Sequence, residues 1–181
     1  PAELMQLPDW YLIKTHAENV ATDEPALLVV RDGRDALLSY AWFALQIVEG
    51  RRREEINADL VHRMLEGLIR YPRPRYGTWG SHTLNWLDRP QTVVIRFEDL
   101  VQRPAEVVGE GLRRLGIPCR ATGQAPPDFA TLKRIFPEFY RSGQVGQWRT
   151  GFPADLLDLF WSLNREPMQR LGYDEDVATA A

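Results

Sequence analysis

Arg31 occupies a position where a charged side chain could do chemistry. It directly follows an unbroken apolar run at residues 27–30, and so short a run without polar alternation is typical of a strand buried on both faces. Residues 31–35 carry no apolar side chain, and beyond them apolar residues recur at helical spacing. In open α/β sheets the ligand crevice lies outside the carboxyl ends of the strands. An arginine fork there, beside the amides of a helix N-terminus, is suited to binding a phosphate, although Arg31 could instead pair with Asp32 or Asp35.

A second polar strand end lies near the start of the chain. The apolar residues 10–13 are followed at once by Lys14, Thr15 and His16, which predicts a strand whose polar tip enters a crevice. Lys14 and Lys133 are the two lysines among 22 basic residues, so each could have a specific task. A lone histidine is more often structural than catalytic, so this segment alone assigns no reaction.

The elements that must position these side chains alternate between strand and helix patterns. A third strand is expected over residues 93–96, followed by Glu98 and Asp99, which we interpret as cap and ion-pair residues. Residues 140–152 contain three glycines and little periodicity, which indicates an ordered functional loop. Helices are expected over residues 35–49, 58–69, 78–87, 104–115, 129–136 and 155–171.

This order of elements predicts an α/β fold of three layers, a mostly parallel sheet with helices on both faces. The length of 181 residues fits a single domain over the whole chain. Three strands are few for such a sheet, and the first residue is proline rather than methionine. We therefore expect a partial chain with one or more strands upstream of Pro1.

Composition excludes several classes of protein. An apolar fraction of 44% argues against disorder, and a net charge of −3 gives no global basic field for nucleic acid. The single cysteine, Cys119, rules out an internal disulfide and a cysteine-built zinc site. No apolar run approaches the length of a membrane-spanning helix, and no charged-then-apolar signal segment opens the chain.

Taken together and in order, five segments are far more specific than any one of them. They are KTH at 14–16, VVRDGRDALLSY at 29–40, YGTWGSHTLNWL at 76–87, VVIRFEDLVQRP at 93–104 and RSGQVGQW at 141–148. This set resembles the cytosolic-type sulfotransferases that depend on 3′-phosphoadenosine 5′-phosphosulfate (PAPS), including their bacterial relatives. The resemblance runs from about Trp10 to Phe152 and implies a fold akin to P-loop kinases. It also implies an enzyme that moves the sulfuryl group from PAPS to a hydroxyl or amine of a small molecule and releases adenosine 3′,5′-bisphosphate (PAP). Such an enzyme is expected to be cytoplasmic and to use no metal.

The resemblance also implies roles for individual residues. His16 matches the catalytic base, and Lys14 the lysine near the 5′-phosphosulfate. The positions that match the family's nucleotide-binding residues are Arg31, Ser39, Arg141, Ser142 and Gly143 at the 3′-phosphate and Phe97 near the adenine. His82 matches a residue of the acceptor pocket in some members, and Tyr76 and Trp79 lie in the same aromatic stretch, which could equally be ordinary core.

The residue types suit this chemistry. An imidazole has a pKa fit to take a proton from a hydroxyl near neutral pH, and a lysine ammonium can neutralise charge that develops on the oxygen between phosphate and sulfate. Arginine and hydroxyl groups on the 3′-phosphate would supply positioning. The glycines at 143 and 146 would let backbone amides approach a phosphate.

The chain also departs from the family pattern. Residues 1–181 contain neither a loop like Tyr-Pro-Lys-Ser-Gly-Thr, which holds the 5′-phosphosulfate in the family, nor the P-loop pattern of nucleotide kinases. Ser142 replaces a lysine, and Ala17 and Glu18 follow His16 where Leu-Pro is common. We therefore expect the chain to cover the carboxyl two-thirds of the fold, and we keep a PAP-binding pseudoenzyme as the alternative function. The sequence specifies neither the acceptor nor the oligomeric state.

Overall fold

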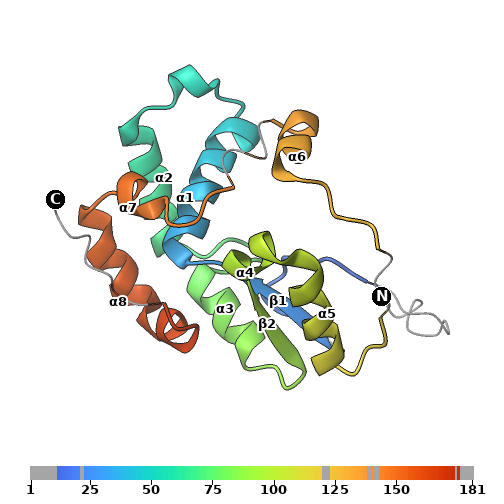
Figure 1. Ribbon diagram of the computed structural model, residues 1–181. Helices are drawn as coiled ribbons and strands as arrows, with labels where there is room; N and C mark the ends of the chain where they lie inside the picture. The colour runs from blue at the N-terminus through green and yellow to red at the C-terminus, as the bar shows by residue number, and fades with distance from the viewer. Residues whose placement is uncertain are drawn as a thin grey trace.

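The computed structural model describes residues 12–20, 23–119, 123–137, 140, 143–173 and 175. Two parallel strands, β1 (Ala26–Val30) and β2 (Thr92–Arg96), lie side by side in the lower half of Figure 1. Their register pairs Leu28 with Val94 and Val30 with Arg96. Both strands were predicted from their apolar runs, and each begins one residue earlier than expected.

Helices pack on both faces of these strands. On one face, Leu28, Val30 and Val94 join the main hydrophobic core, and α3 contacts both strands. On the other face, α5 packs against β2, and Gly111 of α5 approaches Leu27 and Ile95 so closely that a Cβ atom there would lie 2.9 Å from the Leu27 side chain. The α/β prediction with helices on both faces of a parallel sheet is therefore confirmed.

The predicted helices are also found, with small changes at their ends. They are α1 (Gly33–Phe43), α2 (Ala58–Arg70), α3 (Trp79–Leu87), α5 (Pro104–Arg114), α6 (Phe129–Ile135) and α8 (Asp155–Arg170). Two short helices were not predicted, α4 (Phe97–Gln102) and α7 (Trp148–Gly151). The helix expected to reach residue 49 continues beyond α1 as a π-helical segment, η2 (Ala44–Val48), before a short 3₁₀ turn, η3 (Arg53–Glu55). In Figure 1, α6 lies well away from the two strands.

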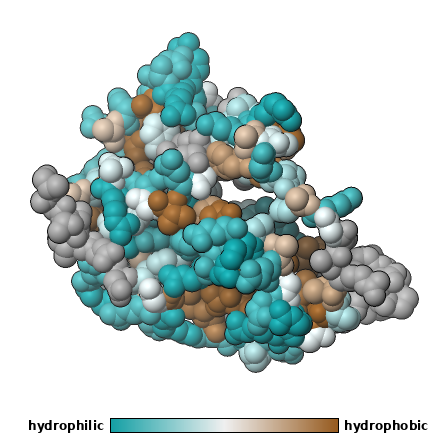
Figure 2. Space-filling view, in the orientation of Figure 1, coloured by the Kyte–Doolittle hydropathy of each residue, from teal (hydrophilic) through white to brown (hydrophobic). Residues whose placement is uncertain are grey.

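The core sits where α8 crosses α1, α2 and α3. Phe160 of α8 is fully buried. The centroid of its ring lies 5.9 Å from the ring centroid of Phe152, 5.9 Å from that of Trp161 and 6.1 Å from that of Trp79. Figure 2 shows a largely hydrophilic surface on one side of the molecule, with apolar residues gathered in separate patches. No helix within the described ranges is long and apolar enough to cross a bilayer.

Two predictions about local structure are wrong. Leu12 and Ile13, expected to end a first strand, have no strand structure and are 94% and 57% exposed, and Trp10 lies outside the described residues. A strand needs a neighbour to receive its backbone hydrogen bonds, and within the described ranges no strand lies beside this segment. The expected loop over 140–152 contains the short helix α7, whose Trp148 is buried.

Candidate active site

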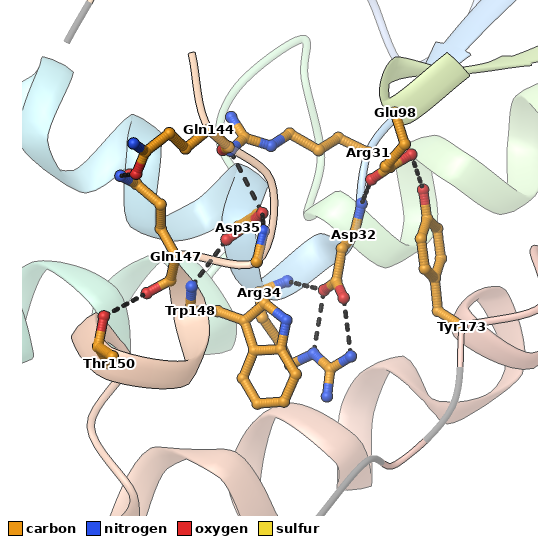
Figure 3. Close-up of polar contacts among 11 residues, drawn as sticks. Arg31, Asp32, Arg34, Asp35, Glu98, Gln144, Gln147, Trp148, Thr150 and Tyr173 are labelled. Atoms are coloured by element: carbon orange, nitrogen blue, oxygen red, sulfur yellow. Dashed lines mark hydrogen bonds and ion pairs between the residues drawn. The ribbon is translucent and has the colours of Figure 1, made fainter. Parts of the chain in front are cut away.

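The turn between β1 and α1 is built by a buried ion pair. Asp32 caps α1 by accepting a hydrogen bond from the Arg34 backbone amide. The same carboxylate accepts two further bonds from the Arg34 side chain, from Nε at 3.0 Å and from Nη2 at 2.7 Å. The Arg34 guanidinium lies over the Trp148 ring, 3.5 Å from its centroid, so this pair also fixes the start of α7 (Figure 3).

Asp35, in the first turn of α1, joins the turn to the distant segment 143–148. It is 1% exposed. Its carboxylate accepts a hydrogen bond from the Gly146 amide at 2.7 Å and another from the Trp148 amide at 2.8 Å, and it pairs with Arg31 Nη2 at 3.3 Å (Figure 3). A buried carboxylate is stable only with such donors around it, so Asp35 holds this segment against the end of β1.

Arg31 lies at the centre of this corner. Its Nη2 also donates to the backbone carbonyl of Gln144 at 2.8 Å, and its guanidinium lies 4.8 Å from the centroid of the Phe97 ring. Its Nε is buried and has no hydrogen-bond partner within the part of the chain that the structure describes. An unpaired buried N–H is costly, and a phosphate oxygen is an acceptor that would satisfy it. The residues present therefore fit an anionic ligand here.

Glu98 secures the end of β2 beside this corner. It accepts a hydrogen bond from the Asp32 backbone amide at 3.4 Å and another from the Tyr173 hydroxyl at 2.9 Å. Burial, reinforced by the bond to Glu98, raises the pKa of the Tyr173 phenol well above its usual value. Glu98 thus acts as a hydrogen-bond acceptor, and among the described residues it forms neither the ion pair nor the helix cap expected from the sequence.

Lys14 and His16 are exposed, on a segment without regular secondary structure. Two hydrogen bonds fix its carboxyl end: Trp86 Nε1 donates to the Ala17 carbonyl at 2.9 Å, and the Glu18 amide donates to the Arg75 carbonyl at 2.8 Å. Within the described ranges no hydrogen bond or ion pair joins this segment to Arg31.

His82 of α3 lies within electrostatic reach of that segment. Burial lowers the pKa of the His82 imidazole, the Glu18 carboxylate partly opposes the shift, and the His16 charge adds to it. The structure therefore places His82, His16 and Glu18 in one neighbourhood.

The remaining candidates are distributed between the corner and the core. Ser39 is half-buried on α1, one turn after Asp35, and its hydroxyl makes no hydrogen bond to another described residue. Tyr76 is half-exposed. Trp79 packs its ring against Phe160 and the backbone of Gly33, so it takes part in the core.

The glycine-rich segment differs in part from its predicted use. Arg141 and Ser142 lie outside the described residues. Gly143 has a φ of 64° and packs closely against the Phe129 ring, which leaves no room for a Cβ. The Gly146 amide, expected to approach a phosphate, is instead bound to Asp35.

Sequence reasoning missed Asp35 as the residue that organises the site and treated it only as a possible partner of Arg31. The available signal was an aspartate in the first turn of a helix next to a buried strand. Its partners at 146 and 148, however, lie more than 100 residues away, and no local pattern identifies them.

Comparison with known proteins agrees with this architecture. The family described as "Sulfotransferase domain" matches residues 1–172. The chain is 25% identical over 159 residues to Sulfotransferase 1E1 of Rattus norvegicus. The match covers 74% of this chain and 51% of that protein. It also resembles the crystal structure of mouse sulfotransferase SULT7A1 complexed with PAP, with a TM-score of 0.61, 19% identity and coverage of 81% of this chain and 59% of the other.

A parallel α/β core with an arginine at its strand end defines the class of fold, and the family match defines the group within it. The chain belongs to the sulfotransferase domain family. It spans about half the length of the curated relative that it matches.

Replacing Asp35 with asparagine should loosen the corner. The asparagine NH₂ would face a group that now donates to Asp35, so at least one buried donor would lose its acceptor. We therefore expect the free energy of unfolding to fall by about 3 kcal/mol. Urea unfolding monitored by tryptophan fluorescence measures this change. Asp158→Asn, the same substitution at an exposed position of α8, is the control; equal effects of the two variants would contradict the assigned role of Asp35.

The lowered pKa of His82 predicts a pH dependence of stability. Because the unfolded imidazole titrates near 6.5 and the folded one below it, the unfolded state binds more protons in the interval between the two values. Stability should therefore fall as the pH drops below about 6.5, and His82→Gln should remove that part of the fall. Urea unfolding of both proteins at pH 8 and pH 5.5 measures it. Parallel losses in the two proteins would show that His82 does not contribute.

Proposed function

We propose that this protein is a sulfotransferase that moves the sulfuryl group from PAPS to a hydroxyl or amine of a small molecule. The observation that carries the proposal is the buried, unpartnered Nε of Arg31 at the carboxyl end of β1, in a chain of the sulfotransferase domain family. A phosphate oxygen would satisfy that donor, and the PAP complex of the mouse relative supports a nucleotide of this kind.

The nucleotide is proposed to bind along the ends of β1 and β2. Arg31 and Ser39 would hold the 3′-phosphate, together with Arg141, Ser142 and Gly143, as the family resemblance implies. Phe97, whose ring lies under the Arg31 guanidinium, would contact the adenine. Since the 3′-phosphate does not react, these contacts supply binding and orientation.

Transfer requires a base and a group that stabilises the leaving oxygen. His16 would take the proton from the acceptor while the acceptor oxygen or nitrogen attacks the sulfur. The bond between sulfur and the bridging oxygen breaks, PAP departs with that electron pair, and the Lys14 ammonium would neutralise the charge on the bridging oxygen. His82, Tyr76 and Trp79 are proposed for the acceptor side. A cytoplasmic location and a bacterial-type relationship stay predictions from the resemblance.

A nucleotide-binding protein without transferase activity is the second candidate. It is favoured by the exposed positions of Lys14 and His16, which no hydrogen bond connects to the Arg31 corner within the described ranges. The two candidates share the nucleotide site and differ only in the chemical step, so binding and transfer must be measured separately.

Calorimetric titration with PAP and a transfer assay with ³⁵S-labelled PAPS separate the two candidates. Arg31→Ala should weaken PAP binding about tenfold or more, because a charge-assisted phosphate contact is lost. His16→Ala should retain PAP binding but lower transfer to a phenolic acceptor about 100-fold. Arg114→Ala and His62→Ala, at positions on α5 and α2 away from the corner, are the controls.

The outcomes distinguish the candidates clearly. Binding that is insensitive to Arg31 would exclude the nucleotide site at β1. Transfer within a few-fold of the parent in His16→Ala would exclude His16 as the base. PAP binding with no transfer by the parent protein would favour the pseudoenzyme.

A further inference from the structure

A groove lies between α2 and the end of the helix that begins as α1, away from the residues assigned to the nucleotide. Its volume is about 540 Å³. One wall is a stripe of α2 at positions 60, 63, 64 and 67, which helical spacing places on one face. The opposite wall comes from Leu45 and Glu49, and the third from the proline-containing segment 71–74.

The groove combines apolar surface with an excess of positive charge. Leu45, Leu60 and Met64 give apolar lining, while three arginines, Arg51, Arg63 and Arg73, face a single acidic residue, Glu49. Arg51 Nε already donates to Glu49 at 2.8 Å. Within the described ranges no carboxylate lies at ion-pair distance from the other two arginines, so both guanidinium groups lack a direct acidic partner there.

Arg73 is the best positioned of the three. Its backbone is pinned by reciprocal hydrogen bonds with Gly77, at 3.0 Å and 2.9 Å. Its half-buried guanidinium lies 5.0 Å from the centroid of the Tyr40 ring and donates to the Tyr40 hydroxyl at 3.4 Å and to the Met64 sulfur at 3.9 Å. These are weak acceptors for a group with five N–H donors, and partial burial of a charge without a counter-ion is unfavourable.

Gly67 keeps the groove open. A Cβ atom at this position would meet nothing within 4 Å. A glycine inside a helix costs stability relative to alanine, and here its missing side chain leaves space between Arg63 and the 71–74 segment. The space has the character of a ligand site, with apolar walls and a few polar groups.

We propose that this groove binds a small organic anion, an apolar ring system bearing one sulfate, carboxylate or phosphate group. The anionic group pairs with Arg73 and Arg63, whose planar forks match such oxyanions, and the ring system lies along Leu60 and Met64. The proposal does not depend on the proposed transferase activity, because none of the residues assigned to the nucleotide lines the groove.

Calorimetry with 2-naphthyl sulfate tests this proposal on the intact protein, with 2-naphthol and inorganic sulfate as the two half-ligands. We expect 2-naphthyl sulfate to bind at least about tenfold more tightly than either half, since only it uses both the arginines and the apolar wall. Arg73→Gln and Arg63→Gln should each weaken binding about tenfold. Arg31→Ala should leave it unchanged, which separates this site from the nucleotide corner.

A steric variant keeps the test independent of charge and of the stability of the Arg73 variant. Gly67→Leu should abolish binding by filling the groove, whereas Gly109→Leu, the same change at an equally open helical glycine of α5, should not affect it. Undetectable binding by the parent protein, equal binding of 2-naphthol, or binding that survives Gly67→Leu would overturn the proposal.

Discussion

The arrangement of the site depends on one buried carboxylate. Asp35 accepts hydrogen bonds from the Gly146 and Trp148 amides and pairs with Arg31, so it joins a strand end, a helix start and a segment more than 100 residues further along the chain. All three partners are donors, and a carboxylate is the side chain that can accept from all of them while buried. Among the described residues, the one other polar bond between the segment 143–148 and this strand end is the one that Arg31 donates to the Gln144 carbonyl.

The position of Arg31 follows from this contact. Asp35 and the Gln144 carbonyl both hold Nη2 of Arg31, which turns the guanidinium over Phe97 and leaves its Nε without a partner within the described ranges. The neighbouring Asp32–Arg34 pair places the other arginine of the turn over the Trp148 ring, where it stabilises packing. Two arginines three residues apart thus have different surroundings, because different carboxylates orient them: the Arg34 fork is paired with Asp32, whereas Arg31 keeps an Nε without a partner among the described residues.

Local sequence patterns correctly predicted the elements whose defining residues are neighbours in the sequence. The apolar runs of β1 and β2 and the amphipathic spacing of α2 required no knowledge of distant residues. The strand expected at Leu12 and Ile13 was wrong because a strand is defined by its neighbour, which an apolar run alone does not specify. The role of Asp35 was missed for a related reason, since its partners are distant in sequence. Gly146, whose φ is 79°, was expected to let its amide approach a phosphate, but in the structure that amide donates to Asp35.

Residue-resolved hydrogen exchange of the 143–148 backbone amides tests the central role of Asp35 most directly. If the carboxylate holds this segment, the Gly146 and Trp148 amides should exchange only through large-scale unfolding, far more slowly than the amide of the half-exposed Val145 between Gln144 and Gly146. Exchange of all three amides at the same fast rate would contradict the account, because it would show that Asp35 does not fix this segment to the strand end.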